Sequence, residues 1–317
     1  MNPKRPLGRT GIAISPLIFG GNVFGWTADK PTSFDLLDRF AGAGFETVDT
    51  ADVYSTWKPG NRGGESETII GEWMRIRGRR DRTVLITKVG MEMAPDRKGL
   101  SAAWIERAVE DSLRRLQTDY IDLYLSHKYD PATAPEETLS AYQKLVTAGK
   151  VRAIGASNFD AIQLRAALEV AATRGLPRYA VLQPEYNLYD RNSYEGALRD
   201  LAMAEGLGVI TYFSLAKGFL SGKYRSEADL GQSPRGGGVK GYLNERGFRI
   251  LKGLDEVASR HAAKPAEVAL AWLMARPGVT APIASATRLD QLDSMLRAAS
   301  LELSLEDLAT LEVASEY

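Results

Sequence analysis

The sequence predicts a (β/α)8 barrel, in which eight parallel strands close into a ring and a helix follows each strand. Short apolar runs alternate with amphipathic segments from residue 17 almost to the end of the 317-residue chain. The runs are apolar throughout rather than alternating with polar residues, which is typical of parallel strands covered by helices. Because no linker or change of composition divides the chain, we expect one domain over residues 1–317.

Eight apolar runs are the predicted barrel strands. In chain order they are Leu17–Gly21, Thr47–Ala51, Val84–Val89, Ile121–His127, Val151–Ala156, Ala180–Gln183, Val209–Phe213 and Thr280–Ala284. Eight segments with a helical pattern accompany them. These span residues 33–42, 65–77, 102–116, 135–148, 161–174, 194–205, 265–275 and 289–299.

Several of these helices carry recognisable start and stop signals. Ser101 is placed to cap the third helix, and Pro135 followed by two glutamates suits a first helical turn. Gly149 and Gly175 stand where a left-handed residue is expected to end a helix. These signals support the predicted boundaries.

A doubly wound parallel sheet is the alternative fold. That fold is expected to show a G-x-G-x-x-G phosphate turn after an early strand. Here the first strand runs into GGNVFGW at residues 20–26, which does not match. The barrel is therefore preferred.

Three segments lie outside the simple repeat. RPLGRTGIAIS at residues 5–15 has a turn at Arg9–Gly11 and is expected to form a hairpin that caps the barrel floor. Residues 214–247 contain five glycines between Gly231 and Gly241, and a loop of this length is usually a functional lid or disordered. Ser304–Ala314 is predicted to be an extra helix with Ser304 and Asp307 as its capping pair.

Composition excludes several kinds of function. The chain has 40 Lys and Arg against 40 Asp and Glu, without the basic excess of a nucleic-acid or anionic-membrane binder. It has no cysteine and only His127 and His261, so disulfides, thiolate chemistry and multi-histidine metal centres are not expected. No apolar run approaches a bilayer span and the N-terminus lacks a secretory signal, so we expect a cytoplasmic protein. The neutral charge does not distinguish a monomer from an assembly.

Polar residues cluster at the predicted carboxyl ends of the strands. In a (β/α)8 barrel these positions face the active site. They are Asp49, Asp52, Tyr54, Lys88, His127, Ser157, Asn158, Gln183, Ser285, Thr287 and Arg288.

Four of these residues suit proton transfer to a carbonyl oxygen. Asp49 would hold the Lys88 ammonium, which would in turn lower the pKa of Tyr54 toward the working pH. His127 would donate a hydrogen bond to the substrate oxygen. None of these groups supplies a hydride, so a nicotinamide cofactor would have to bring it. The plainer alternatives are a structural Lys88–Asp49 ion pair and a hydrogen-bonded core histidine.

Aromatic and apolar loop residues are expected to wall the substrate pocket around Tyr54 and His127. The candidates are Val23, Phe24, Trp26, Trp57 and Tyr129. An aromatic wall suits aldehydes with hydrophobic or sugar-like groups, whereas ordinary loop packing is the alternative.

The residues resemble the aldo-keto reductase family over essentially the whole chain. The most specific motifs are VDTADVY with GGESETIIG, ITKVG, LRRLQTDYIDLYLSH, GKVRAIGASNF, LQPEYN, GFLSGKY and IASATRLDQL. The sequence is most similar to the bacterial branch that contains general stress proteins, aryl-alcohol-type dehydrogenases and potassium-channel β-subunit relatives.

The resemblance implies a barrel that binds NADP(H) in extended form and acts on a small carbonyl or alcohol substrate. It places the catalytic tetrad on Asp49, Tyr54, Lys88 and His127, with Tyr54 as general acid in reduction and base in oxidation. The substrate pocket expected from the loop residues, with Trp26 and Trp57 beside Tyr54 and His127, lies next to this tetrad.

The resemblance also implies a set of cofactor contacts. Ser157, Asn158 and Gln183 match residues that bind the nicotinamide carboxamide, and Tyr212 matches the aromatic that stacks on the nicotinamide ring. The residues that match the pyrophosphate-binding segment are Phe213, Ser214, Leu215, Ala216, Gly218 and Lys223, and Arg235 is expected to close over the pyrophosphate. Ser285, Thr287, Arg288 and Gln291 match the segment for the adenine and the 2′-phosphate, and the set is completed by Gly21, Asn22 and Asp49.

The chain departs from the family pattern at three places. Ser214 replaces a common proline, Met295 replaces an asparagine that many members place against the adenine, and Ala284–Ser285 replaces the usual Pro-Lys or Pro-Gly. Arg288 therefore carries most of the case for NADP over NAD.

Two other functions are compatible with the motifs. The channel-subunit relatives indicate a cofactor-binding regulatory subunit with little turnover. A Schiff-base lyase with Lys88 as nucleophile is a third reading, but it leaves Ser157, Asn158, Gln183 and Tyr212 unexplained.

Overall fold

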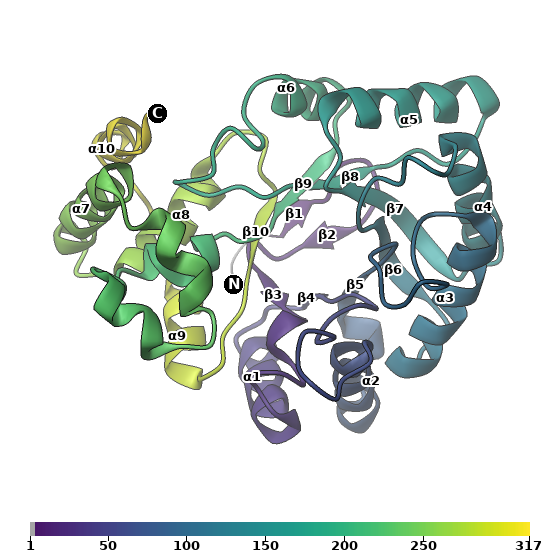
Figure 1. Cartoon of the computed structure of the whole chain (residues 1–317), viewed down its shortest axis with the longest axis horizontal. Helices are drawn as coiled ribbons and strands as arrows, with labels where there is room; N and C mark the ends of the chain where they lie inside the picture. The colour runs from purple at the N-terminus through teal and green to yellow at the C-terminus, as the bar shows by residue number, and fades with distance from the viewer. Residues whose placement is uncertain (1–3) are drawn as a thin grey trace.

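A computed structural model describes residues 4–317 and has a closed barrel of eight parallel strands ringed by helices (Figure 1). The strands pair in the order β10-β3-β4-β5-β6-β7-β8-β9, and β9 pairs with β10 to complete the ring. The predicted (β/α)8 fold is confirmed. A helix spanning a bilayer would have to be long and apolar, and none within residues 4–317 is both.

All eight predicted strands are present, with ends within two residues of their expected positions. The barrel strands are β3 (Ile18–Gly20), β4 (Thr47–Asp49), β5 (Val84–Val89), β6 (Ile121–Ser126), β7 (Val151–Ser157), β8 (Val181–Gln183), β9 (Gly208–Thr211) and β10 (Ala281–Ala284). The N-terminal hairpin is the antiparallel pair β1 (Arg5–Pro6) and β2 (Ala13–Ile14).

The eight predicted helices are present as well. The α-helices are α1 (Lys30–Gly42), α2 (Glu65–Arg77), α3 (Ala102–Leu116), α4 (Pro135–Thr147), α5 (Ala161–Arg174), α6 (Ala197–Ala204), α7 (Glu245–Arg260), α8 (Pro265–Ala275), α9 (Leu289–Ala298) and α10 (Leu305–Ser315). Short 3-10 helices are η1 (Gly21–Val23), η2 (Arg80–Arg82), η3 (Ala216–Ser221), η4 (Glu227–Gln232) and η5 (Gly236–Tyr242).

Two predicted helix starts are displaced. The first helix begins earlier than expected, because Asp29 caps it through the backbone N–H of Thr32 and a proline sits in its first turn. The sixth begins later, because Gly196 adopts a φ of 86° immediately before it. The predicted caps at Ser101 and Ser304 are present.

Helix α7 was not predicted. Asn244 caps it by accepting a hydrogen bond from the backbone N–H of Gly247. Its buried side chains include Ile250, Leu251, Leu254 and Val257, a spacing that the sequence itself contains. The preceding glycine-rich stretch masked this pattern. The helix packs against α8 and α10 beside the barrel (Figure 1).

The hairpin closes the floor of the barrel, as predicted. Leu7 and Ile14 are fully buried and join the barrel-interior cluster that includes Ile18, Ile86 and Leu123. Gly8 makes the close approach possible, because a Cβ at this position would lie 2.3 Å from the backbone nitrogen of Gly208.

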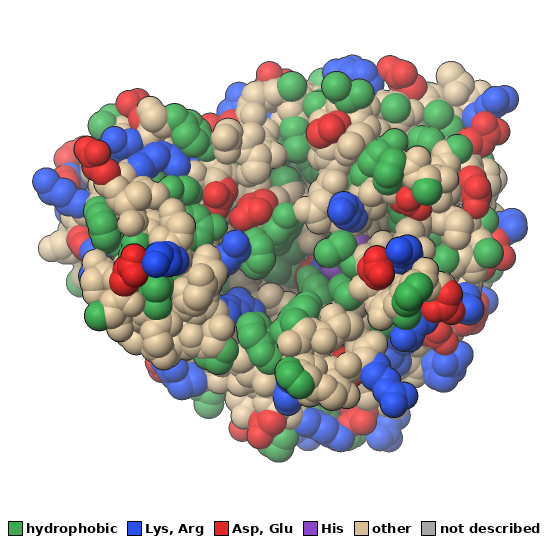
Figure 2. All heavy atoms as spheres, in the orientation of Figure 1, with side chains coloured by type: hydrophobic (Ala, Val, Ile, Leu, Met, Phe, Trp, Pro, Cys, Tyr) green, Lys and Arg blue, Asp and Glu red, His purple; other side chains and the backbone are tan. Residues whose placement is uncertain are grey.

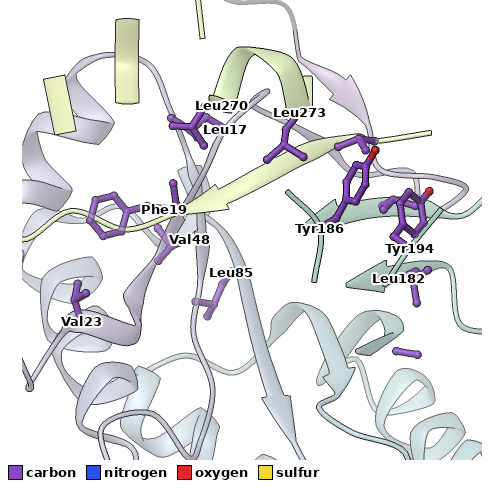
Figure 3. Close-up of a cluster of buried hydrophobic side chains, with 14 of the residues drawn as sticks. Leu17, Phe19, Val23, Val48, Leu85, Leu182, Tyr186, Tyr194, Leu270 and Leu273 are labelled. Carbon is purple, nitrogen blue, oxygen red and sulfur yellow. The ribbon is translucent and has the colours of Figure 1, made fainter. Parts of the chain in front are cut away.

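A second layer of core lies between the barrel and its helices. Phe19 and Leu85 point away from the barrel axis while their neighbours Ile18 and Ile86 point inward, following the period of two along a strand. Figure 3 shows part of this layer, including Leu270 and Leu273 from α8. The two layers hold the strand ends in fixed relative positions, and those ends carry the site.

Asp307 fixes α10 to α7 through a buried carboxylate. It accepts hydrogen bonds from the Ser304 hydroxyl at 2.7 Å, from Arg260 at 3.0 Å and, at 2.8 Å, contacts Nε2 of His261. Burial alone would raise the pKa of Asp307, but the hydrogen bonds from His261, Ser304 and Arg260 together hold it well below its usual value of 3.8.

We therefore expect Asp307→Asn to lower the free energy of unfolding at neutral pH by about 2–4 kcal/mol, since it removes a buried, hydrogen-bonded charge. Because the folded pKa lies below the unfolded one, this stabilisation is complete above pH 3.8 and disappears as the pH falls through the folded value. Urea unfolding across this range should show a weaker acid dependence in the variant. Asp255→Asn, at an exposed ion pair with Arg225, is the control and should change stability by less than about 1 kcal/mol. Equal acid dependence in the Asp307 variant and the wild type would contradict this account.

Candidate active site

A large cavity opens at the carboxyl ends of the barrel strands. Its volume is about 1280 Å³, and its lining includes Gly20, Asp49, Ser157, Gln183 and Ala284, which end five of the strands. Figure 2 shows the hollow on this face of the molecule. Most of the polar strand ends identified in the sequence therefore converge on one cavity, whereas Asp52 and Lys88 are buried and do not line it.

The structure brings the four predicted catalytic residues together at the base of this cavity. The Lys88 ammonium donates to Asp49 Oδ1 at 2.6 Å, to the Thr50 carbonyl at 2.8 Å and to the Tyr54 hydroxyl oxygen at 2.9 Å. Tyr54 in turn donates to Asp49 Oδ1 at 3.3 Å, and its ring centroid is 6.0 Å from that of His127.

Lys88 is enclosed rather than open to the cavity. Its side chain is 0% exposed, and all three N–H donors of its ammonium are used. Burial lowers the pKa of Lys88, and the Asp49 carboxylate opposes that change. An enclosed, fully hydrogen-bonded ammonium is poorly placed to attack a substrate carbonyl.

The pKa of Tyr54 moves in the opposite direction from the one expected. Burial raises it well above 10.0, and the Asp49 carboxylate raises it further, while the charge of Arg235 opposes the rise. The sequence-based expectation weighed the Lys88 ammonium but not the desolvation of the phenol. At neutral pH the Tyr54 hydroxyl keeps its proton and is able to donate it.

His127 is neutral in this environment. Burial lowers its pKa well below 6.5, and the charge of Lys88 adds to the effect. Within the described residues its Nδ1 is buried without a hydrogen-bond partner. A neutral imidazole carries one N–H, so His127 has a single hydrogen bond to donate.

The ends of β7 and β8 and the residue after β9 form a second hydrogen-bonded group. Asn158 donates to Ser157 Oγ at 3.1 Å and accepts from the Tyr212 hydroxyl at 2.6 Å. Gln183 Nε2 donates to Asp49 Oδ2 at 2.8 Å. Of the predicted carboxamide-binding residues, Gln183 therefore contacts the predicted catalytic group directly, through the second oxygen of Asp49.

The loop after β9 follows an unusual path beside the cavity. Phe213, Ala216 and Lys217 have φ values of 49°, 46° and 57°, in the left-handed region that side chains other than glycine rarely adopt. Such conformations are maintained only by surrounding structure and cluster at ligand sites. Tyr212, Phe213, Ser214, Leu215 and Gly218 all line the cavity, whereas Ala216 is fully buried behind it.

The far end of the cavity is formed around β10 and the start of α9. Ser285 Oγ donates to Asn22 Oδ1 at 2.7 Å, and Gln291 Oε1 accepts from the backbone N–H of Thr287 at 2.9 Å. Arg288 lies at the N-terminus of α9 and forms an exposed ion pair with Asp290 at 3.0 Å. Lys223 and Arg235 also line the cavity, as predicted.

Besides Ala216, another predicted cofactor-binding residue, at the end of β3, does not line the cavity. Gly21 does not line the cavity, and its place there is taken by Gly20. A Cβ on Gly20 would lie 2.6 Å from Ser285 Oγ, so the glycine leaves room for the Ser285–Asn22 contact.

The predicted apolar wall is partly wrong. Val23, Trp26 and Trp57 line the cavity. Phe24 instead stacks on Phe19 at 5.3 Å between centroids, and Tyr129 packs edge-on against Phe159 at 5.4 Å. Burial in these loops is not periodic, so their sequence does not reveal which side chains face inward.

Sequence reasoning also missed several cavity residues. They include Met91 and the cations Lys58, Lys128 and Lys264. Only Lys128 had a usable signal, because it directly follows His127 at the end of β6.

Comparison with known proteins identifies the family. The model of the aldo/keto reductase family matches residues 16–316. The chain belongs to this family. The predicted resemblance is thus confirmed, and the protein is an oxidoreductase of the class that acts on carbonyl compounds.

Three relatives illustrate the range of the aldo/keto reductases similar to this chain. An uncharacterized oxidoreductase, YrpG, of Bacillus subtilis is 36% identical and covers 96% of this chain and 93% of its own length. Norsolorinic acid reductase of Emericella nidulans is 33% identical, over 95% of this chain and 78% of its own. A probable voltage-gated potassium channel subunit beta of Oryza sativa subsp. japonica is 33% identical, over 92% and 89%.

The residues present fit the nicotinamide cofactor that the family implies. Lys217, Lys223 and Lys264 line the cavity, and across residues 4–317 none of them has an ion-pair partner. Unpaired cations and a strained backbone turn beside a deep cavity suit the phosphates of a dinucleotide. The Ser157, Asn158 and Gln183 side chains offer the donors and acceptors that an amide requires.

Proposed function

We propose that this aldo/keto reductase interconverts aldehydes or ketones and alcohols with NADP(H), and that Tyr54 is the general acid in reduction and the base in oxidation. The observation that carries the proposal is the contact of Lys88 with both Asp49 and Tyr54, at 2.6 Å and 2.9 Å, at the base of the cavity. We propose residues 1–317 as one catalytic domain, since its cavity draws on residues from Gly20 to Met295.

The cofactor would lie across the strand ends from Gln183 to Arg288. Ser157, Asn158 and Gln183 would hold its carboxamide, Tyr212 its ring, and Arg288 with Gln291 its adenosine end. When bound, the nicotinamide supplies the hydride that no side chain can provide.

Side chains of the protein carry out the proton transfer. Tyr54 holds its hydroxyl proton at neutral pH and gives it to the carbonyl oxygen as negative charge develops there. The Lys88 ammonium, fixed by Asp49, stabilises the tyrosinate that remains. Neutral His127 donates its N–H to the same oxygen and sets the approach of the substrate.

Cofactor choice is tested by fluorescence titration with NADPH and, separately, NADH, using the 5 tryptophans of the chain as the signal. We expect saturable quenching that is much tighter for NADPH. Arg288→Ala should raise the Kd for NADPH about tenfold or more and leave that for NADH nearly unchanged, because only NADPH presents a charged 2′-phosphate.

Arg39→Ala is the matched control, since Arg39 also forms an exposed ion pair with an aspartate of α9. It should change neither Kd. Equal binding of both cofactors would contradict the NADP assignment, and binding of neither would contradict the whole cofactor site.

A second candidate is a nicotinamide-binding regulatory subunit with little turnover. The similarity to a probable channel subunit beta supports it. The enclosed Lys88–Tyr54–Asp49 group favours the enzyme, since a purely regulatory site needs no proton donor. Tight NADPH binding with negligible turnover on a broad carbonyl panel would favour the subunit instead.

A further inference from the structure

The turn that follows β9, residues 213–218, has a backbone conformation that its side chains disfavour. Phe213 has a φ of 49°, in the left-handed region where any residue other than glycine is strained. Phe213 lines the cavity, and so does Lys217 in the same turn. A strained conformation of this kind persists only where neighbouring structure fixes it. The shape of this part of the cavity therefore depends on contacts that hold Phe213 in place.

Asn187 makes such a contact from another part of the chain. Its Nδ2 donates a hydrogen bond to the Phe213 carbonyl at 3.1 Å, and the same carbonyl accepts from the backbone N–H of Ala216 at 2.7 Å. Within the described residues, the other side-chain hydrogen bonds of residues 213–218 are local, between residues three apart. Asn187 therefore links the carbonyl on which the turn closes to the rest of the fold.

The amide of Asn187 is itself held on every side. Its second N–H donates to Asp190 Oδ2 at 3.0 Å, and its Oδ1 accepts from the backbone N–H groups of Tyr189 and Asp190 at 2.8 Å and 2.9 Å. An amide side chain has two N–H donors and two lone pairs, so its whole hydrogen-bonding capacity is used. The side chain is 0% exposed. A buried amide with every position filled has one orientation, and it can serve as a fixed anchor.

Asn187 does not itself line the cavity, although it lies four residues after Gln183, which does. Beyond β8 and β9 the two chain segments continue side by side, because Glu185 and Tyr212 form a parallel bridge. This pairing brings Asn187 alongside Phe213. Any effect of Asn187 on a ligand in the cavity is therefore transmitted through the backbone of the turn.

We propose that Asn187 is a positioning residue for the cofactor, which holds Phe213 in the left-handed conformation and so keeps the turn in its binding shape. This inference rests on the proposed NADP(H)-dependent function. Without the amide contact, Phe213 spends most of its time in ordinary backbone conformations. Only the fraction of molecules with the turn formed then binds the cofactor, and the apparent affinity falls by that fraction.

The first test is titration of Asn187→Ala with NADPH, followed by tryptophan fluorescence. We expect the Kd to rise about 5- to 30-fold, the population ratio that corresponds to the usual penalty of a left-handed residue. At saturating NADPH, kcat should fall less than about threefold, because the proton-transfer group is unchanged. Asn187→Asp should raise the Kd at least as much. It keeps the acceptor oxygen for Tyr189 and Asp190 but places a second oxygen against the Phe213 carbonyl.

A second-site variant tests whether Asn187 acts through the backbone of Phe213. Glycine adopts a positive φ readily, so a turn with Phe213→Gly has less need of an anchor. In that background, Asn187→Ala should raise the Kd for NADPH by less than about threefold. Comparing the effect of Asn187→Ala in the two backgrounds cancels the loss of the Phe213 ring from the cavity. An equal rise in both backgrounds would overturn the proposal.

Hydrogen exchange of the protein without cofactor gives an independent measurement. Asn187→Ala should speed amide exchange in residues 213–220 by about fivefold or more and leave exchange in the barrel strands unchanged. Asn61→Ala is the matched control, since Asn61 also donates to two loop carbonyls, those of Gly25 and Ser55, at 3.1 Å and 3.0 Å. It should change neither the Kd for NADPH nor exchange in the turn. Faster exchange throughout the barrel by the same factor in Asn187→Ala would assign Asn187 to general stability and overturn the proposal.

Failure of this inference is distinguishable from failure of the proposed function. If the wild type binds NADPH and Asn187→Ala binds it equally tightly, the role given to Asn187 alone is wrong. If the wild type binds neither NADPH nor NADH, the proposed function fails, and the ligand assigned to the turn fails with it.

Discussion

Tyr54→Phe is expected to reduce kcat for carbonyl reduction by about 10²- to 10⁴-fold, the usual contribution of a positioned general acid. The variant loses only the hydroxyl that Lys88 contacts at 2.9 Å, and the ring can keep its packing against Trp57 and His127. NADPH affinity should change little, because the proposed cofactor contacts lie on other side chains. Steady-state turnover of several aldehydes, with NADPH titration beside it, measures both quantities.

Tyr129→Phe provides the control for this experiment. Tyr129 packs against Phe159 outside the cavity, so loss of its hydroxyl should leave kcat unchanged. Full turnover by Tyr54→Phe on several carbonyl substrates would show that Tyr54 is not the proton donor.

Lys88→Met is expected to damage both activity and stability. The substitution leaves Asp49, which is 1% exposed, without its cation, and breaking a buried pair in this way costs about 3–5 kcal/mol. It also removes the ammonium that stabilises the Tyr54 oxygen, so kcat should fall by at least about 10²-fold. Urea unfolding gives the first quantity, and turnover of the protein that remains folded gives the second.

A double variant separates the two effects. Asp49→Asn combined with Lys88→Met removes both charges, so it should be more stable than Lys88→Met alone while remaining equally inactive. The amide oxygen introduced at position 49 would still be available to Gln183, which donates to the Asp49 side chain in the wild type. If Lys88→Met retained wild-type turnover, or if the second substitution restored it, the role given to Lys88 would be wrong.

The barrel and the catalytic group were predictable because their signals are local. Each strand is a short apolar run, and the carboxyl ends of the strands meet at one rim of the barrel once the ring closes, as with Asp49 at the end of β4. Helix α7 was missed although Ile250, Leu251 and Leu254 have helical spacing, because the glycines before it were interpreted as the start of a longer loop.

Other features could not be predicted, because they depend on which residues surround a side chain in the folded structure. Burial has the largest effect on the pKa of Tyr54, and a sequence motif does not show how deeply a side chain is buried. The predicted direction of this pKa shift was therefore wrong. Loop side chains such as Phe24 and Tyr129 pack in the core rather than against the cavity because of the aromatic partners they contact. The sequence spacing of these partners follows no regular period. The position of Arg235 over Trp26 joins two segments more than 200 residues apart, which only the folded chain reveals.

Asp49 uses its two oxygens for different partners, Oδ1 for Lys88 and Tyr54 and Oδ2 for Gln183. One carboxylate therefore belongs at once to the proton-handling group and to the proposed amide-binding group on the opposite side of the ring. A ligand that reoriented Gln183 would remove one hydrogen-bond donor from the Asp49 carboxylate and so alter its interaction with Lys88. By thermodynamic reciprocity, protonation of that group would change the affinity for the ligand by the same factor by which the ligand changes its proton affinity. Ligand occupancy and protonation would then be coupled through a single side chain.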